Sequence, residues 1–347
     1  MTPFHAGRSL FSYAGRAVMC AIVFSIGLAV YERNSLWNEA TLLWGDVSLK
    51  SPLKARGHGA LGIAYFDKGR MDDAINEYRA ALELTYDHPD LHYNIANALS
   101  EKGFIPEAVT EYRIALSLKP DFAKARNNLG RALDRQGFIE DALKEYLAAL
   151  RLDSGLAEAR NNLGNAYGKL GLVSAAVSEY RAAIRINPDF AQARYNLGNS
   201  YVKTGLTDEA VSEYLAALRI KPDFAEARNN LGLAYEKQGR IEEALWQYRA
   251  ALESGTGLAD THNNLGSVYA MRGNIEDAVK EYEKAVLLNP YYSDAYYNLG
   301  LAYRMQGMEA ESKEAFKIAS ELMSEAVKAK KPGKATAKQR GVPRESP

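Results

Sequence analysis

Residues 157–190 read AEARNNLGNAYGKLGLVSAAVSEYRAAIRINPDF, and residues 191–224 repeat the pattern as AQARYNLGNSYVKTGLTDEAVSEYLAALRIKPDF. The two stretches align without a gap, and the same period holds over eight copies. A glycine marks the same slot in seven copies, and Ala96 replaces it in the second: Gly62, Gly130, Gly164, Gly198, Gly232, Gly266 and Gly300. A second glycine follows seven positions later in every copy, from Gly69 to Gly307. Such a period predicts a solenoid, in which each unit buries its apolar face against its neighbours.

Each copy has the pattern of two helices. In the copy at 157–190, the first helix contains Gly164 and ends at Gly171, because glycine commonly ends helices. The second contains Ala176 and Tyr180 at helical spacing and ends before Pro188. The small residues allow the two helix axes to approach closely, and a bulky side chain at Ala176 would overpack the contact at a cost of roughly 1–3 kcal/mol. The fold class is therefore predicted to be all-α.

The motif L-G-x2-Y, then A-x3-Y, then Pro, on this period, resembles the tetratricopeptide repeat. The small residue recurs from Ala74 to Ala278, with Ser312 in the last copy, and the aromatic residue recurs from Tyr78 to Tyr282, with Phe316 last. The resemblance covers residues 55–326. It implies antiparallel helix pairs stacked into a superhelical solenoid with a concave groove. It divides the region into eight repeats, at 55–88, 89–122, 123–156, 157–190, 191–224, 225–258, 259–292 and 293–326.

The overall charge is balanced. Lys plus Arg and Asp plus Glu each total 43, so the formal net charge is zero. Strong electrostatic attraction to nucleic acid is therefore not expected. The single cysteine, Cys20, has no partner in the chain, which excludes an intrachain disulfide.

The N-terminal residues 1–31 combine a basic start with an apolar stretch. Residues 17–31 carry no charge but are too short for the ~30 Å hydrocarbon core. Extension back to Leu10 gives spanning length and includes Arg16, which would snorkel towards the headgroups. We expect residues 10–31 to form a single membrane anchor. A cleaved signal peptide, with small residues at Gly27 and Ala29 before a cut, is the main alternative, and a buried helix is another.

Residues 32–54 contain half a repeat. Ala40, Trp44 and Val47 have the spacing of Ala74, Tyr78 and Ala81 one period later. This stretch therefore predicts a second helix without its first, which would cover the apolar face of the first full repeat.

A second resemblance rests on the residues around this half-repeat. Arg33-Asn34-x2-Trp37, then Leu43-Trp44-x-Asp46, then Ser51-Pro52 before the repeats, is similar to multipass proteins that join a glycosyltransferase-like membrane domain to tetratricopeptide repeats. In that family the repeats face the non-cytoplasmic side, which implies the same location here. The catalytic region of such proteins is absent from this chain, so glycosyl transfer is not inferred.

No motif in the sequence predicts catalysis, a cofactor or a metal site. The run from Gly57 to Gly62 matches G-x-G-x-x-G, but it lies inside a predicted helix with no strand before it. His88 and His92 are four apart, and Pro89 between them favours two surface histidines. A stripe of glutamates beside the core aromatic residue is interpreted as a solvated outer face: Glu77, Glu111, Glu145, Glu179, Glu213 and Glu281. Residues 327–347 are predicted to be a basic disordered tail.

One polar slot repeats two positions before the packing glycine or alanine. We call these residues the asparagine ladder: Asn94, Asn128, Asn162, Asn196, Asn230, Asn264 and Asn298. In the family this slot faces the groove, and a carboxamide can pair with an extended peptide backbone because it both donates and accepts. The repeat region of O-linked N-acetylglucosamine transferase has a similar ladder that holds peptide backbone. Hydrogen bonding between neighbouring helices is the alternative role.

Two further sets of residues would widen this surface. Asn97, Asn165 and Asn199 follow three positions after the ladder, on the same helix face. Lys169, Lys203 and Lys237 follow four positions later and predict a positive rim. The lysine-and-asparagine clamp that some family members use for a terminal carboxylate is not matched, because its first-helix lysine slot holds Tyr or Asn.

Three functions remain open from the sequence. The first is a membrane-tethered scaffold, not an enzyme, that binds an extended protein or peptide segment in its groove. The second is a non-catalytic subunit of envelope glycan or polysaccharide synthesis or export, which the second resemblance suggests. The third, an enzyme in its own right, has no motif to support it.

Overall fold

The computed structural model describes residues 39–85, 87–255 and 259–330. This part of the chain forms 17 helices and contains no strand, so the predicted all-α solenoid of tetratricopeptide-like helix pairs is confirmed. The predicted membrane segment, residues 10–31, lies outside the described residues. The same holds for residues 331–347 of the predicted tail.

The helices divide into two compact units, Met1–Leu170 and Gly171–Pro347, which are described separately. The helices of the first unit are α2 (Ala40–Lys50), α3 (Ala55–Asp67), α4 (Met71–Leu84), α5 (Pro89–Glu101), α6 (Ile105–Leu118), α7 (Ala123–Arg135), α8 (Ile139–Leu152) and α9 (Ala157–Lys169). Those of the second are α10 (Val173–Ile186), α11 (Ala191–Lys203), α12 (Thr207–Ile220), α13 (Ala225–Lys237), α14 (Ile241–Glu253), α15 (Ala259–Met271), α16 (Ile275–Leu288), α17 (Ser293–Met305) and α18 (Glu309–Lys330). The superhelical turn of the whole array stays a prediction.

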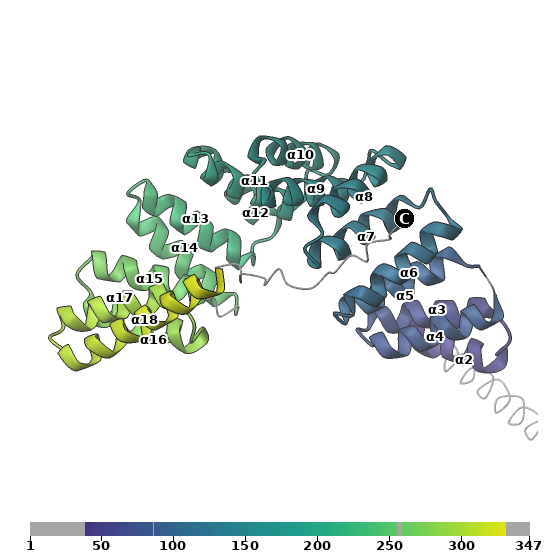
Figure 1. The fold of residues 1–347 in the computed structure, drawn as a ribbon, viewed down its shortest axis with the longest axis horizontal. Coiled ribbons are helices and arrows are strands. Elements are labelled where there is room, and N and C mark those ends of the chain that lie inside the picture. The colour runs from purple at the N-terminus through teal and green to yellow at the C-terminus, as the bar shows by residue number, and fades with distance from the viewer. Residues whose placement is uncertain (1–38, 86, 256–258, 331–347) are drawn as a thin grey trace, which may run out of the picture. The chain divides into compact units, whose positions relative to one another are not determined.

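Within each unit, consecutive helices lie side by side, as Figure 1 shows. The first helices of the repeats begin at a constant interval, at positions 55, 89, 123, 157, 191, 225, 259 and 293. The turn inside each repeat contains a glycine with positive φ, between 73° at Gly239 and 87° at Gly103. Such φ values strain residues that carry a Cβ, so the turn slot requires glycine. The short turn then folds the second helix back against the first.

The other repeated glycine allows the two helices of a repeat to touch. A Cβ at Gly62 would lie 2.5 Å from the ring of Tyr78, and one at Gly232 would lie 2.6 Å from the ring of Tyr248. Real Cβ contacts are essentially never this short, so the first helix can carry no side chain at this slot without moving the ring. The aromatic residue is buried in each case, with 2% and 0% of its surface exposed.

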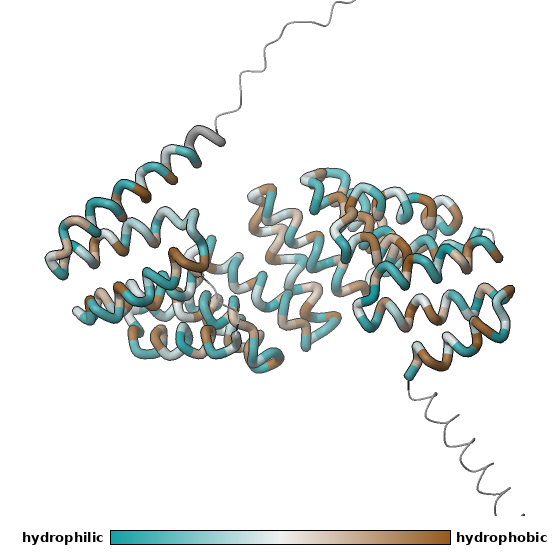
Figure 2. The backbone as a smooth tube through the Cα atoms, turned by 90° about the horizontal axis from the view of Figure 1, so that it is seen from below, coloured by the Kyte–Doolittle hydropathy of each residue, from teal (hydrophilic) through white to brown (hydrophobic). Residues whose placement is uncertain are grey.

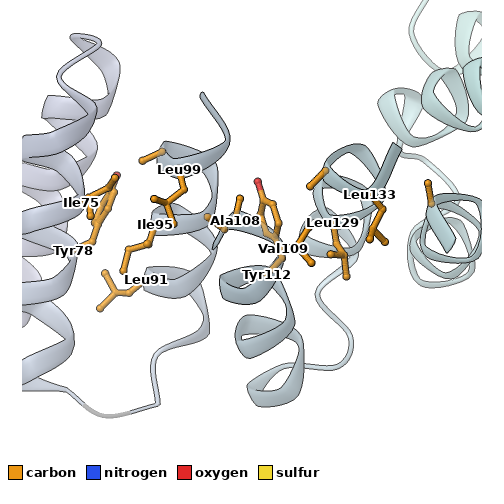
Figure 3. Close-up of a cluster of buried hydrophobic side chains, with 14 of the residues drawn as sticks. Ile75, Tyr78, Leu91, Ile95, Leu99, Ala108, Val109, Tyr112, Leu129 and Leu133 are labelled. Carbon is orange, nitrogen blue, oxygen red and sulfur yellow. The ribbon is translucent and has the colours of Figure 1, made fainter. Parts of the chain in front are cut away.

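The core runs from repeat to repeat instead of surrounding one centre. Figure 3 shows its course from Ile75 on α4 through Ile95 on α5 and Tyr112 on α6 to Leu129 on α7. Apolar and polar segments alternate along the helices (Figure 2), as expected where one face packs and the other is solvated. Within each unit, a helix that lies between two others is therefore stabilised by both of them.

The prediction of a solvated glutamate stripe is wrong. Glu111 is only 23% exposed, and its carboxylate lies 2.7 Å from Nδ1 of His92 on the first helix of the same repeat. The same pairing between the two helices of one repeat joins Glu77 to His58, Glu145 to Arg126, Glu213 to Arg194 and Glu281 to His262. The slot precedes the buried aromatic residue, so it lies at the boundary between the two helices and not on the outer face. His92, predicted at the surface, is therefore half-buried and hydrogen-bonded to a carboxylate within its repeat.

The ends of the array differ from its middle. Helix α2 packs against α3, with Val47 Cγ1 3.5 Å from the Cβ position of Gly57, and Ser48 is buried. Ala40, aligned with the fully buried Ala74, is instead exposed. At the other end, α18 continues to Lys330, so the first residues of the predicted tail, 327–330, are helical. Ser324 stands there in place of the closing proline, but Ser154 fills the same slot after α8, which ends at Leu152, so the missing proline does not by itself explain the longer helix.

No helix in the described ranges is long and apolar enough to cross a bilayer. Residues 10–31 lie outside those ranges.

The close contact of glycine and aromatic ring predicts the outcome of one substitution. We expect Gly232→Ala to lower the free energy of unfolding by about 1–3 kcal/mol, because the new methyl group overpacks against Tyr248. Gly45→Ala is the matched control, since a Cβ at Gly45 meets nothing within 4 Å; there alanine should stabilise the helix slightly. Thermal unfolding of both variants measures the effect. Equal midpoints for Gly232→Ala and the unaltered chain would contradict this account of the helix contact.

Candidate functional site

The structure places the predicted residues on the first helices of the repeats. The ladder members lie on α5, α7, α9, α11, α13, α15 and α17, and each is half-buried. Asn97, Asn165 and Asn199 are also half-buried, on α5, α9 and α11. Lys169, Lys203 and Lys237 are the exposed last residues of α9, α11 and α13.

Two ladder members are fully engaged as donors inside the fold. Nδ2 of Asn230 donates to the hydroxyl of Tyr195 at 3.2 Å and to Oδ1 of Asn199 at 2.8 Å. The hydroxyl of Tyr214 also donates to Asn199 Oδ1, at 2.7 Å. Burial raises the pKa of Tyr214, which keeps this hydroxyl protonated and able to donate. Nδ2 of Asn229 donates to Asn230 Oδ1 at 3.2 Å, so the carboxamide of Asn230 is held from both sides.

The first unit contains the same arrangement. Asn128 donates to the hydroxyl of Tyr93 and to Oδ1 of Asn97, and Tyr112 donates to Asn97 as well. Both cases occur where the preceding repeat carries tyrosine just before its ladder asparagine. The alternative role of the ladder, hydrogen bonding between neighbouring helices, therefore applies to Asn128 and Asn230.

Other ladder members make a single bond to the preceding repeat. Asn162, Asn264 and Asn298 each donate from Nδ2 to the Oδ1 of an asparagine on the first helix of that repeat, at 2.9–3.1 Å. In the part of the chain that the structure describes, this bond uses one of the two N–H groups. The ladder is therefore not uniform. The bonding of these members depends on the residue that comes just before the ladder asparagine of the preceding repeat. Where that residue is tyrosine, the member makes two donor bonds, and where it is asparagine, the member makes one.

The three predicted lysines also differ in their partners. Lys169 Nζ lies 2.8 Å and 2.7 Å from the two carboxylate oxygens of Asp134, on the neighbouring first helix α7. Its charge is already compensated. Lys203 and Lys237 form no ion pair or hydrogen bond with any residue that the structure describes.

Four predicted residues meet at one hollow in the second unit. A pocket of about 440 Å³ lies between α11 and α13, over the ring of Tyr214. Its lining residues are Asn199, Val202, Lys203, Tyr214, Asn230, Leu233, Ala234 and Lys237. The pocket thus has an apolar floor, amide groups at one side and two cations at its rim.

A second hollow, which the sequence analysis missed, lies at the start of the first unit. It measures about 510 Å³ between α3 and α5, and Asn94 is the one predicted residue in its lining. It exists because the first repeat carries Gly59 and Ala60 where the later repeats carry Tyr or Asn. The presence of two such small residues at positions that are otherwise Tyr or Asn was the sequence feature that could have predicted this hollow.

The described residues contain no group of three or more His, Cys, Asp or Glu side chains that could hold a metal ion. The G-x-G-x-x-G run lies within α3, where Gly57 contacts α2 and Gly62 contacts the ring of Tyr78. Both glycines therefore have packing roles.

Comparisons with known proteins agree with the repeat pattern. One family model, described as TPR repeat, matches residues 62–103, 173–205, 198–239 and 266–307. Models described as Tetratricopeptide repeat match residues 93–157, 224–255 and 293–322. A comparison with curated proteins found no match.

Two solved structures show the extent of similarity to single proteins. The crystal structure of MamA is 32% identical, covering 46% of this chain and 94% of MamA, with a TM-score of 0.42. The crystal structure of YrrB, a TPR protein with an unusual peptide-binding site, is 29% identical, covering 53% of this chain and 95% of YrrB, with a TM-score of 0.44.

The two kinds of ladder asparagine should differ in their effect on stability. We expect Asn230→Ala to cost about 1–3 kcal/mol, because it leaves Tyr195 and Asn199 without their shared donor. Asn264→Ala removes one bond, to Asn229, and should cost about 1 kcal/mol or less. Thermal unfolding midpoints of the two variants provide the comparison. A loss for Asn264→Ala as large as that for Asn230→Ala would show that the ladder is structurally uniform.

Proposed function

The chain belongs to the tetratricopeptide repeat family, and from this premise we propose that it is a binding scaffold whose first helices hold an extended segment of a partner protein. The observation that carries the proposal is the pocket between α11 and α13, where an apolar floor lies beside amide groups and two uncompensated lysines. Pockets that bind peptides or small ligands combine apolar walls with a few placed polar groups in this way. No reaction is proposed.

The hydrogen-bonding capacity of the first helices supports an extended backbone as the bound form. The single bond that Asn264 and Asn298 each make leaves one N–H group and the carbonyl oxygen of the carboxamide. These are the groups that pair with the C=O and N–H of an extended chain. Asn230 contributes differently, because its donors hold the wall of the pocket in place.

Selection from a random twelve-residue peptide display library tests this function. We expect the intact chain to enrich peptides, which should then bind in solution with micromolar dissociation constants. Leu233→Trp should weaken their binding at least tenfold, because the larger side chain fills the pocket. Leu287→Trp is the matched control, since Leu287 is 80% exposed on the second helix α16.

Both variants should keep the unfolding midpoint of the unaltered chain, because neither leucine is fully buried. Failure to enrich any peptide would refute the binding function. Equal affinities of the two variants would place the bound segment somewhere other than this pocket.

We also propose that residues 10–31 attach the scaffold to a membrane as a single-pass segment. This proposal rests on the sequence alone, on the uncharged run 17–31 and its extension to Leu10. The expected result is that the full-length chain stays in the membrane fraction after an alkaline wash and is released by detergent. A mature protein that begins near Val30, determined by mass spectrometry, would instead identify a cleaved signal peptide. A glycosyltransferase as the main co-purifying protein would favour the alternative role in envelope glycan assembly.

A further inference from the structure

The pocket between α11 and α13 lies wholly within the second unit, and its lining has two parts. Val202, Leu233 and Ala234 form an apolar surface with the ring of Tyr214. A volume of about 440 Å³ is large enough for a side chain of leucine or phenylalanine size. The apolar part therefore favours burial of one such side chain from a bound segment.

The polar part consists of donors. Oδ1 of Asn199 already accepts hydrogen bonds from Tyr214 and Asn230, so the Nδ2 group is the part of this carboxamide that can serve a bound ligand. Lys203 and Lys237 supply ammonium groups at the rim. A site that offers donors and positive charge beside an apolar floor is complementary to a group that accepts hydrogen bonds and carries negative charge.

Lys203 and Lys237 have no carboxylate partner among the described residues because the residue that would face each of them on the preceding first helix is not acidic. Asp134, which neutralises Lys169, stands three positions before its turn glycine. The corresponding slots of the next two repeats hold Gly168 and Val202, neither of which carries a charge. The pocket therefore lacks the internal carboxylate that the same lysine slot has one repeat earlier.

Acidic side chains next to the pocket are engaged elsewhere. The carboxylate of Glu236, adjacent to Lys237, accepts a hydrogen bond from the hydroxyl of Tyr248 at 2.9 Å. Asp208 accepts one from Nε2 of Gln238. The C-terminal residues 331–347 carry five Lys and Arg residues and one Glu, so their charge has the wrong sign to occupy this site.

We propose that this pocket is a subsite for an acidic peptide segment, in which a large apolar side chain enters the hollow and an adjacent Asp or Glu carboxylate binds Lys203 and Lys237. The inference rests on the peptide-binding function proposed above and specifies which peptides bind. The lysines lie at the C-terminal ends of α11 and α13, where a cation also interacts favourably with the helix dipole. If Lys203 and Lys237 only stabilised the helix ends, replacing them would lower the stability of the fold and leave the selected peptides unchanged.

The test is a comparison of peptides selected from the same random display library by three forms of the full chain. The unaltered chain should enrich Asp or Glu within two positions of Leu, Ile or Phe. The double variant Lys203→Glu with Lys237→Glu should enrich Lys or Arg there instead. Lys169→Gln, the matched control, removes a lysine that is already paired with Asp134 and should retain the acidic preference.

Affinities give a second readout that does not require charge reversal. For an enriched acidic peptide, Lys203→Gln and Lys237→Gln should each weaken binding about tenfold, and added salt should reduce the difference from the unaltered chain. Lys169→Gln should change the affinity less than twofold. If the double variant does not fold, these neutral single variants still test the proposal.

The outcomes separate this inference from the function on which it depends. Enriched peptides without an acidic preference, or a preference that survives both substitutions, would overturn the acidic subsite and leave peptide binding intact. No enriched peptide at all would overturn both.

Discussion

The contact between a backbone glycine and the face of an aromatic ring determines how close the two helices can lie in six of the repeats. A Cβ at Gly62, Gly130, Gly198, Gly232, Gly266 or Gly300 would approach the ring to 2.5–2.9 Å. Because the ring fills the space that a side chain would need, the two helices of each of these six repeats can approach closely. This packing also fixes where the other side chains of the first helix lie, including those at the asparagine and lysine positions. The surface proposed to bind a partner is thus a consequence of this packing.

The fold could be predicted well because the deciding interactions are local in sequence. Gly232 and its aromatic partner Tyr248 belong to the same repeat, and the turn glycine Gly239 lies between them, so one copy of the repeat contains every residue that its helix pair needs. The two ends of the array follow the repeat less closely. Ala40 is exposed although its counterpart Ala74 is fully buried, and α18 continues to Lys330, so residues 327–330 are helical where a disordered tail was predicted.

The site was harder to predict because its chemistry depends on the preceding repeat. Ladder asparagines are identical in sequence, yet Asn230 is tied by Tyr195 and Asn199, whereas Asn264 makes one bond. Lysines in one slot likewise differ, because Asp134 faces Lys169 and no described carboxylate faces Lys237. The glutamate stripe was misinterpreted for a related reason, since its partners lie on the other helix of the repeat. These pairs are missed when each repeat position is considered alone. They could be found by comparing each position with the position that it contacts on the adjacent helix.

The central claim is that a partner segment lies against the first helices, and the most direct test is to map where a bound peptide touches the chain. A display-selected peptide that carries a benzophenone group would be irradiated in complex with the full-length protein, and the adducts located by mass spectrometry. The account predicts adducts on α11 and α13, around Val202 and Leu233. Adducts confined to the second helices α12, α14 and α16, for example at the exposed Trp246, would contradict it.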